Sequence, residues 1–175
     1  AWYAYEAWAG ANGLPLFDRS AVPAVTVDGF YGTNYSRARK PGIQPDTITY
    51  YDLPNTLSVE DNAGGEVTWK TGPMYEYSDF ETRDKYRAFL RGNNAYSLLE
   101  GNGEGSILVV KDSYANSFIP YLVENYAQIG IVDLRYTVEK VDSFIQRGGY
   151  DKVLVLYSFS TFAEDTNFAS RAGVA

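Results

Sequence analysis

The last seventy residues of the chain alternate between apolar runs typical of strands and segments with helical periodicity. The pattern predicts strands at 106–111, 129–134 and 152–158, separated by helices at 115–127 and 138–147. Such an alternation, with strands that are almost continuously apolar, is typical of a parallel sheet that helices cover on both faces. The sequence therefore predicts an α/β fold.

The stretch from residue 22 to residue 73 has a different character. Its short runs of β-prone residues are separated by Gly, Pro and Asn, which favour turns. We interpret 22–73 as a β-rich insertion within a single domain spanning 1–175, because 175 residues with 45% apolar side chains can bury one sizeable core. Residues 2–9 predict a helix with no capping side chain ahead of it, so we expect the chain to continue upstream in a longer protein.

A serine follows the first of these apolar strands, where the next helix is expected to begin. The strand ends in Lys111-Asp112-Ser113-Tyr114. Hydrolases of the α/β class hold a nucleophile at this position, and the free N–H groups and dipole of the helix can stabilise an oxyanion beside it. Asp112 or Ser113 can equally serve as the helix cap. Ser113 is therefore a candidate nucleophile with a structural alternative.

Further polar and aromatic side chains follow the predicted strands. Ligands of α/β sheets bind outside the carboxyl ends of the strands, which makes Tyr114, Arg135 and Tyr157 candidates for substrate binding. Asp133 and Arg135 lie two apart in a predicted strand and so share a face. Arg135 is then either part of a buried ion pair or an anion-binding group.

Two loops offer additional candidates. Asn93 and Asn94 lie in a turn, where their amides can reach a ligand or bond to the backbone of the loop. The loop 29–37 is dense in glycine, aromatic and hydroxyl side chains, and its Tyr31 and Tyr35 could line a polar cleft.

Composition excludes several classes of function. The chain has no cysteine and no histidine, which removes disulfides and the usual ligands of transition metals, so any bound metal would be ligated by oxygen. We expect no metal site and no cofactor. The net charge of −7 and the lack of a basic block argue against nucleic acid as a partner. No run approaches the roughly twenty apolar residues of a membrane span, and oligomeric state stays open.

Several segments resemble a known family. Residues 107–120, 131–136 and 151–157 look like the C-terminal portion of the DHHW family of bacterial proteins, which is similar to the SGNH-hydrolase-like proteins of alginate O-acetylation. The loop 29–33 and the predicted helix 2–9 resemble the same family. The resemblance covers most of the chain and is most specific for the Asp-Ser-Tyr segment.

The resemblance implies a three-layer α/β/α SGNH-hydrolase-like fold in an extracytoplasmic protein of the bacterial envelope. Ser113 would be the nucleophile of a serine esterase or O-acetyltransferase acting on a polysaccharide, and Asn93-Asn94 would correspond to the glycine-asparagine block that donates to the oxyanion. The Asp-His-His-Trp signature of the family lies upstream of a helix like 2–9, and no residue here can be its His or Asp. The 175 residues alone are therefore expected to be inactive.

Two other functions are compatible with the same residues. In a non-catalytic glycan-binding or envelope-scaffold module, Ser113 would be only a cap and the loop from Phe30 to Tyr35 would bind the glycan. A nucleotide or phosphate binder ranks last, because the turn after the first strand lacks the glycines that such sites need.

Overall fold

The computed structural model describes residues 1–32, 35, 41–62 and 66–172. The chain divides into two compact units, which are treated separately below. Unit 1 comprises Ala1–Phe17, Asn55–Pro73 and Asn93–Ala175, and unit 2 comprises Asp18–Pro54 and Met74–Gly92.

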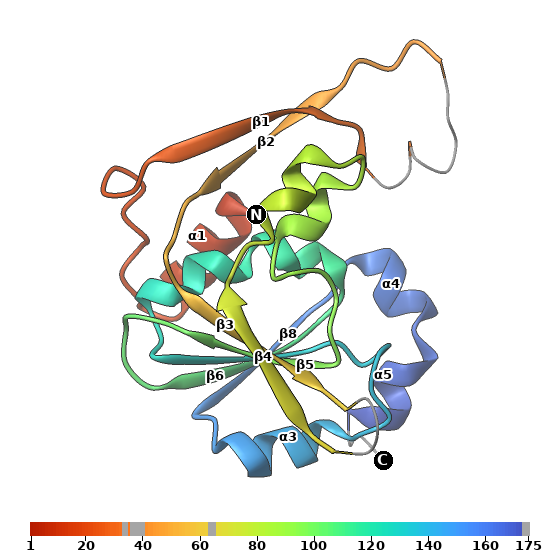
Figure 1. Ribbon diagram of the computed structural model, residues 1–175. Helices are drawn as coiled ribbons and strands as arrows, with labels where there is room; N and C mark the ends of the chain where they lie inside the picture. The colour runs from red at the N-terminus through yellow and green to blue at the C-terminus, as the bar shows by residue number, and fades with distance from the viewer. Residues whose placement is uncertain (33–34, 36–40, 63–65, 173–175) are drawn as a thin grey trace. The chain divides into compact units, whose positions relative to one another are not determined.

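Unit 1 is built on a six-stranded mixed sheet with the order β4-β3-β5-β7-β6-β8 (Figure 1). Strand β6 lies between β7 and β8 and runs parallel to both, whereas the pairs β5–β7, β3–β5 and β3–β4 are antiparallel. The strands are β3 (Thr56–Asp61), β4 (Thr68–Pro73), β5 (Tyr96–Glu100), β6 (Ser106–Lys111), β7 (Gln128–Val132) and β8 (Lys152–Leu156).

The three C-terminal strands and their parallel pairing confirm the predicted alternation, but the expectation of a parallel sheet is wrong for the sheet as a whole. The short turn 101–105 reverses the chain between β5 and β6. Because β7 is parallel to β6, β5 must run antiparallel to β7 when the two pair. The hairpin of β3 and β4 then adds two more antiparallel pairs.

Helical segments lie on both faces of this sheet (Figure 1). On one face, α3 (Val141–Gly148) packs Val141 and Phe144 against Leu108 and Val110 of β6. The other face carries α1 (Trp2–Ala11) and two 3₁₀ helices, η3 (Ser113–Ser117) and η4 (Ile119–Glu124). Two short helices, α4 (Phe159–Glu164) and α5 (Thr166–Arg171), follow β8. The buried β6 thus receives apolar cover from both sides.

The helix expected over 115–127 is replaced by η3 and η4. Pro120 has no N–H to donate to the carbonyl of Asn116, and its ring would clash with that carbonyl in a continuous α-helix. The segment therefore tightens into two 3₁₀ pieces on either side of Phe118. The helices expected at 2–9 and 138–147 are present as α1 and α3.

The first helix is fixed to unit 1 by aromatic packing and by one buried tyrosine. The hydroxyl of Tyr5 donates to Asn125 Oδ1 at 2.9 Å and accepts from the backbone N–H of Phe17 at 2.9 Å. Rings in contact around it belong to Trp2, Tyr5, Trp8, Phe17, Phe118, Tyr121 and Tyr126. Many of the aromatic residues of the sequence therefore serve core packing.

Unit 2 contains a two-stranded antiparallel sheet of β1 (Ala24–Phe30) and β2 (Asp46–Tyr51) and two 3₁₀ helices, η1 (Tyr77–Glu81) and η2 (Lys85–Ala88). Its core is aromatic, with Tyr50 stacked on Phe80 at 4.4 Å between ring centroids. The expected β-rich stretch 22–73 is thus shared between the units: β1 and β2 belong to unit 2, whereas β3 and β4 extend the sheet of unit 1.

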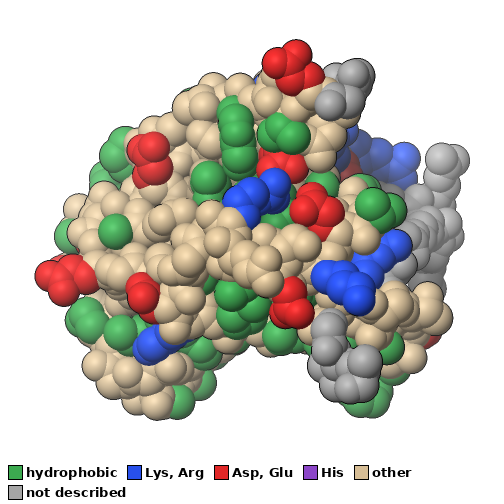
Figure 2. Space-filling model, turned by 90° about the horizontal axis from the view of Figure 1, so that it is seen from below, with side chains coloured by type: hydrophobic (Ala, Val, Ile, Leu, Met, Phe, Trp, Pro, Cys, Tyr) green, Lys and Arg blue, Asp and Glu red, His purple; other side chains and the backbone are tan. Residues whose placement is uncertain are grey.

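The charged side chains are dispersed on the face seen in Figure 2, where Lys and Arg alternate with Asp and Glu and form no continuous basic patch. Within the described part of the chain, no helix is both long and apolar enough to cross a membrane.

Candidate functional site

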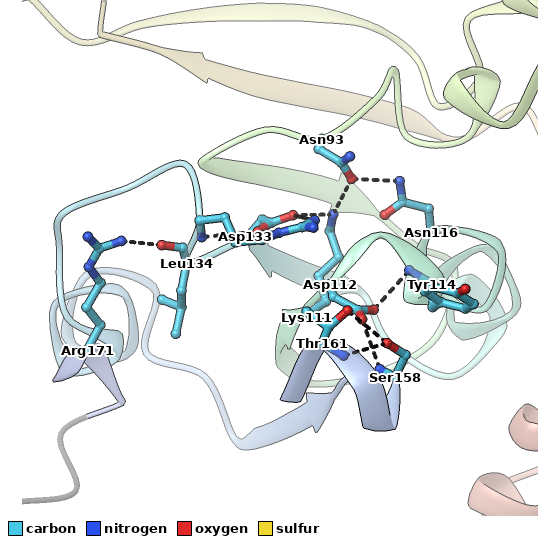
Figure 3. Close-up of polar contacts among 11 residues, drawn as sticks. Asn93, Lys111, Asp112, Tyr114, Asn116, Asp133, Leu134, Ser158, Thr161 and Arg171 are labelled. Carbon is cyan, nitrogen blue, oxygen red and sulfur yellow. Dashed lines mark hydrogen bonds and ion pairs between the residues drawn. The ribbon is translucent and has the colours of Figure 1, made fainter. Parts of the chain in front are cut away.

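Three charged side chains meet where β6 and β7 end. Lys111, the last residue of β6, is 1% exposed, and Asp133, which follows β7, is fully buried. The ammonium group of Lys111 lies 3.4 Å from Asp133 Oδ2, and the guanidinium group of Arg135 contacts both oxygens of the same carboxylate (Figure 3). Asp133 is therefore shared by two cations.

Burial perturbs the lysine of this cluster. The apolar surroundings at the end of β6 disfavour the charged form and lower the pKa of Lys111 to about 8, although the charge of Asp133 acts in the opposite direction. At neutral pH the ammonium form still predominates, because pH 7 lies below that value. A buried ammonium group needs acceptors, and the structure supplies them from Asp133 and Asn93.

Arg135 forms an ion pair with the buried Asp133, and its own side chain is 30% exposed, so the predicted structural pair is present but only partly buried. Its Nε donates to Asp133 Oδ1 at 2.8 Å and its Nη2 donates to Asp133 Oδ2 at 2.6 Å. These hydrogen bonds raise the pKa of Arg135 above its ordinary value. The two residues meet for a different reason than expected: β7 ends at Val132, and a turn closed by Tyr136 N–H and the Asp133 carbonyl brings Arg135 back to Asp133. Anion binding by Arg135 stays a prediction.

Asp112 is the cap of the helix that begins at Ser113. Its Oδ1 accepts from the backbone N–H of Tyr114 and its Oδ2 from that of Ser158, each at 2.9 Å. Burial alone would raise the pKa of the Asp112 carboxyl, but the hydrogen bonds from Ser158, Thr161 and Tyr114 outweigh it and lower the pKa. The fully buried carboxylate thereby joins the end of β6 to the start of α4.

Ser113 is left available by this arrangement. It is the first residue of η3 and is half-buried. Its hydroxyl has no hydrogen-bond partner among the residues that the structure describes. The capping alternative considered for Ser113 is filled by Asp112, so the hydroxyl remains free for another role.

Asn93 lies against the lysine and against η3. Its Oδ1 accepts from Lys111 Nζ at 3.2 Å and from Nδ2 of the buried Asn116 at 3.1 Å (Figure 3). Asn94, the other predicted amide, is half-buried at the next position. The structure thus brings Asn93, Lys111 and Asn116 together beside the segment that carries Ser113.

The predicted tyrosines are placed in different surroundings. Tyr114 is 66% exposed, next to Ser113. Tyr157 is half-buried against Phe162 and Phe168, and burial raises the pKa of its hydroxyl. Tyr31 and Tyr35 belong to unit 2, where their rings stack with centroids 4.5 Å apart and planes 20° apart. Their substrate-binding roles stay predictions.

Three residues of the site were missed by the sequence reasoning. Lys111 shares a strand face with Ile107 and Val109, and this alternation could have indicated that its side chain is buried. Asn116 follows Ser113 by three residues, the spacing of a 3₁₀ turn. Arg171 of α5 donates to the carbonyls of Leu134 and Thr137 and so holds the turn after β7, a long-range contact that no local pattern indicates.

A metal site is not evident in this geometry. Among the described residues, no group of three or more acidic side chains is placed to hold an ion. The nearby carboxylates of Asp112 and Asp133 are both occupied by hydrogen-bond donors from the protein. The Ser113 hydroxyl and the Asn93 amide nitrogen, in contrast, have no hydrogen-bond partner among the described residues.

Fold and site together define a mixed α/β protein with a polar cluster and a serine at the carboxyl ends of its parallel strands. The chain belongs to the DHHW family, since the profile described as "DHHW protein" matches residues 1–132. A search of curated protein sequences found no significant match.

Solved structures with the same fold have low sequence identity. A DHHW family protein from Eubacterium siraeum DSM 15702 matches with a TM-score of 0.72 and 20% identity over 98% of this chain and 56% of that one. Bacillus cereus PatB1 with a sulfonyl adduct matches with a TM-score of 0.66 and 19% identity over 94% of this chain and 58% of that one. A second structure of Bacillus cereus PatB1 matches with a TM-score of 0.65 and 18% identity over 94% of this chain and 59% of that one. The chain thus spans somewhat more than half the length of these proteins.

Proposed function

We propose that Ser113 is the nucleophile of an SGNH-like serine esterase or O-acyltransferase that acts on a bacterial envelope or extracellular polysaccharide. In this proposal the sheet with helices on both faces is a variant of the three-layer α/β/α SGNH arrangement, and the protein is extracytoplasmic. The 175 residues contain no histidine, so the proposal assigns the general base to a residue outside this sequence.

The proposal rests mainly on one observation: Asp112 caps the helix, whereas Ser113 does not. Asp112 takes the capping bonds, while the Ser113 hydroxyl stays unpaired within the described residues at the N-terminal turn of η3. The cap is supplied by Asp112, so the Ser113 hydroxyl is not required for it. Family membership and the fold shared with PatB1, of which one structure carries a sulfonyl adduct, support the same assignment.

The chemistry would proceed in two steps. Ser113 Oγ attacks the acyl carbonyl carbon while the external base accepts its proton, and the ester C–O bond of the donor breaks as the leaving alkoxide takes that proton back. The oxygen of a glycan hydroxyl or of water then attacks the carbonyl carbon of the acyl-serine while the same base takes its proton, and the bond from that carbon to Ser113 Oγ breaks as the base returns the proton to Oγ. In this proposal the amide of Asn93 or Asn94 donates to the oxygen that becomes negative in each step.

The test is acyl release from p-nitrophenyl acetate by a version of the protein that extends upstream of Ala1. Ser113→Ala should reduce the rate by about 10³-fold or more, because the covalent step is lost. Ser117→Ala, a serine substitution in the same helix η3, should leave the rate within about twofold. Activity in Ser113→Ala equal to that of the parent would contradict the proposal.

A glycan-binding module is the second candidate, and the stacked Tyr31–Tyr35 pair favours it, since Tyr31 is 41% exposed. Exposed aromatic faces are suited to packing against sugar rings. Replacing both tyrosines by alanine should then abolish retention of the 175-residue chain on immobilised polysaccharide, while Tyr3→Ala, at a tyrosine that is 84% exposed on α1, should not. Equal retention of the double variant and the parent would exclude this role for the pair.

A further inference from the structure

The orientation of the Asn93 amide is fixed by chemistry. A lysine ammonium group can only donate, so the Asn93 atom that faces Lys111 Nζ at 3.2 Å must be the oxygen. The same oxygen accepts from Asn116 Nδ2 at 3.1 Å, which occupies its second lone pair. The amide nitrogen of Asn93 is therefore directed away from both donors, as Figure 3 shows.

The two N–H groups on that nitrogen are unused. Asn93 is half-buried, and its Nδ2 has no hydrogen-bond partner in the described ranges of the chain. Leaving a partly buried donor unsatisfied is unfavourable unless water or a ligand accepts from it. The amide thus offers two donors of known direction.

Asn116 links this amide to the helix that carries the candidate nucleophile. Ser113 and Asn116 lie three residues apart in a 3₁₀ turn, in which side chains at i and i+3 are eclipsed. Asn93 contacts Asn116 directly. No hydrogen bond joins Lys111 to Ser113 among the described residues, so the geometry does not make Lys111 the base of the serine.

We propose that Lys111 is a positioning residue, whose buried ammonium group, together with Asn116, holds the Asn93 amide with its nitrogen outward as the donor to the acyl oxygen of a substrate at Ser113. This inference rests on the function proposed above. The hydrogen bond from the cation is charge-assisted, and it polarises the amide so that its N–H groups become stronger donors. Asp133 in turn balances the charge of the buried lysine.

Such a role explains why a lysine is present at position 111 although its burial is energetically unfavourable. A lysine at 1% exposure has lost its hydration, and an apolar side chain of similar volume would fill the end of β6 without that penalty. If the ammonium group fixes and polarises a substrate-binding amide, the cost of burying it is offset by a role in function.

The test compares kcat and KM for p-nitrophenyl acetate in the upstream-extended protein. Asn93→Asp keeps the oxygen that faces Lys111 but replaces the outward donors by an acceptor, so kcat should fall about 10²-fold with KM within twofold. Lys111→Met should lower kcat at least about tenfold. In an Asn93→Ala background, Lys111→Met should cause no further loss, because the lysine acts through the amide. Lys70→Met, at a lysine whose side chain is 66% exposed, is the matched control.

The outcomes separate the two proposals. Loss of activity in Ser113→Ala without loss in Lys111→Met, or additive losses in the Asn93→Ala background, would overturn the positioning role and leave the nucleophile intact. Full activity in Ser113→Ala would overturn the proposed function and the positioning role with it. If Lys111→Met does not fold, Asn116→Ala removes the other donor to Asn93 and is expected to lower kcat in the same way.

Discussion

Asp133→Asn is expected to lower the free energy of unfolding by about 3–5 kcal/mol, since it removes one member of a buried charge cluster and leaves the others without a counter-charge. Lys111 cannot reach solvent at 1% exposure, whereas the Arg135 side chain is 30% exposed and can turn outward. The penalty therefore falls mainly on the lysine. An asparagine at 133 keeps the shape of the side chain but offers one oxygen in place of two.

Equilibrium unfolding in urea at pH 7 measures this loss, with an unchanged m-value as the sign that the folded and unfolded states expose the same surface. Asp61→Asn is the matched control, because Asp61 pairs with the exposed Lys70 and exposed ion pairs contribute about 0–1 kcal/mol. A loss for Asp133→Asn no larger than that of the control would mean that Lys111 has another source of compensation.

The residues after β6 and β7 show which features local patterns can predict. Asp133 and Arg135 do contact each other, but the predicted shared strand face is wrong, because β7 ends at Val132 and a turn brings the two residues together. Ser113 was predicted at the junction of a buried strand and a helix, and the structure places it there. These features depend on residues close together in the chain, and local patterns report them well.

The parts that could not be predicted depend on contacts between distant residues. The antiparallel pairing of β5 with β7 joins segments about thirty residues apart in the sequence, and nothing in either strand specifies the partner. The position of Asn93 beside Lys111 and Asn116 likewise follows from the path of the whole chain. Pro120, in contrast, is a local signal against a continuous helix over 115–127, so the break in this segment can be predicted from the sequence.

The turn between β5 and β6 depends on glycines that allow close approach of the backbone. A Cβ atom at Gly101 would lie 2.0 Å from the carbonyl oxygen of Tyr126 and 2.8 Å from that of Val123. Both are backbone atoms at or beyond the end of η4, and the Gly101 N–H also donates to the Ala127 carbonyl at 2.9 Å. No rotamer change can relieve the overlap, so the turn or the end of η4 would have to move.

Gly101→Ala is therefore expected to destabilise the protein by about 3 kcal/mol, the upper range for substitutions that force a backbone shift. Gly10→Ala makes the same chemical change within α1, where a Cβ meets nothing within 4 Å, and should stabilise by about 0.5–1 kcal/mol because alanine favours the helix. Equilibrium unfolding of the two variants in urea measures both changes in the free energy of unfolding. Equal midpoints would show that the turn 101–105 can move away from η4 at little cost, in which case it would not fix β5 relative to β6.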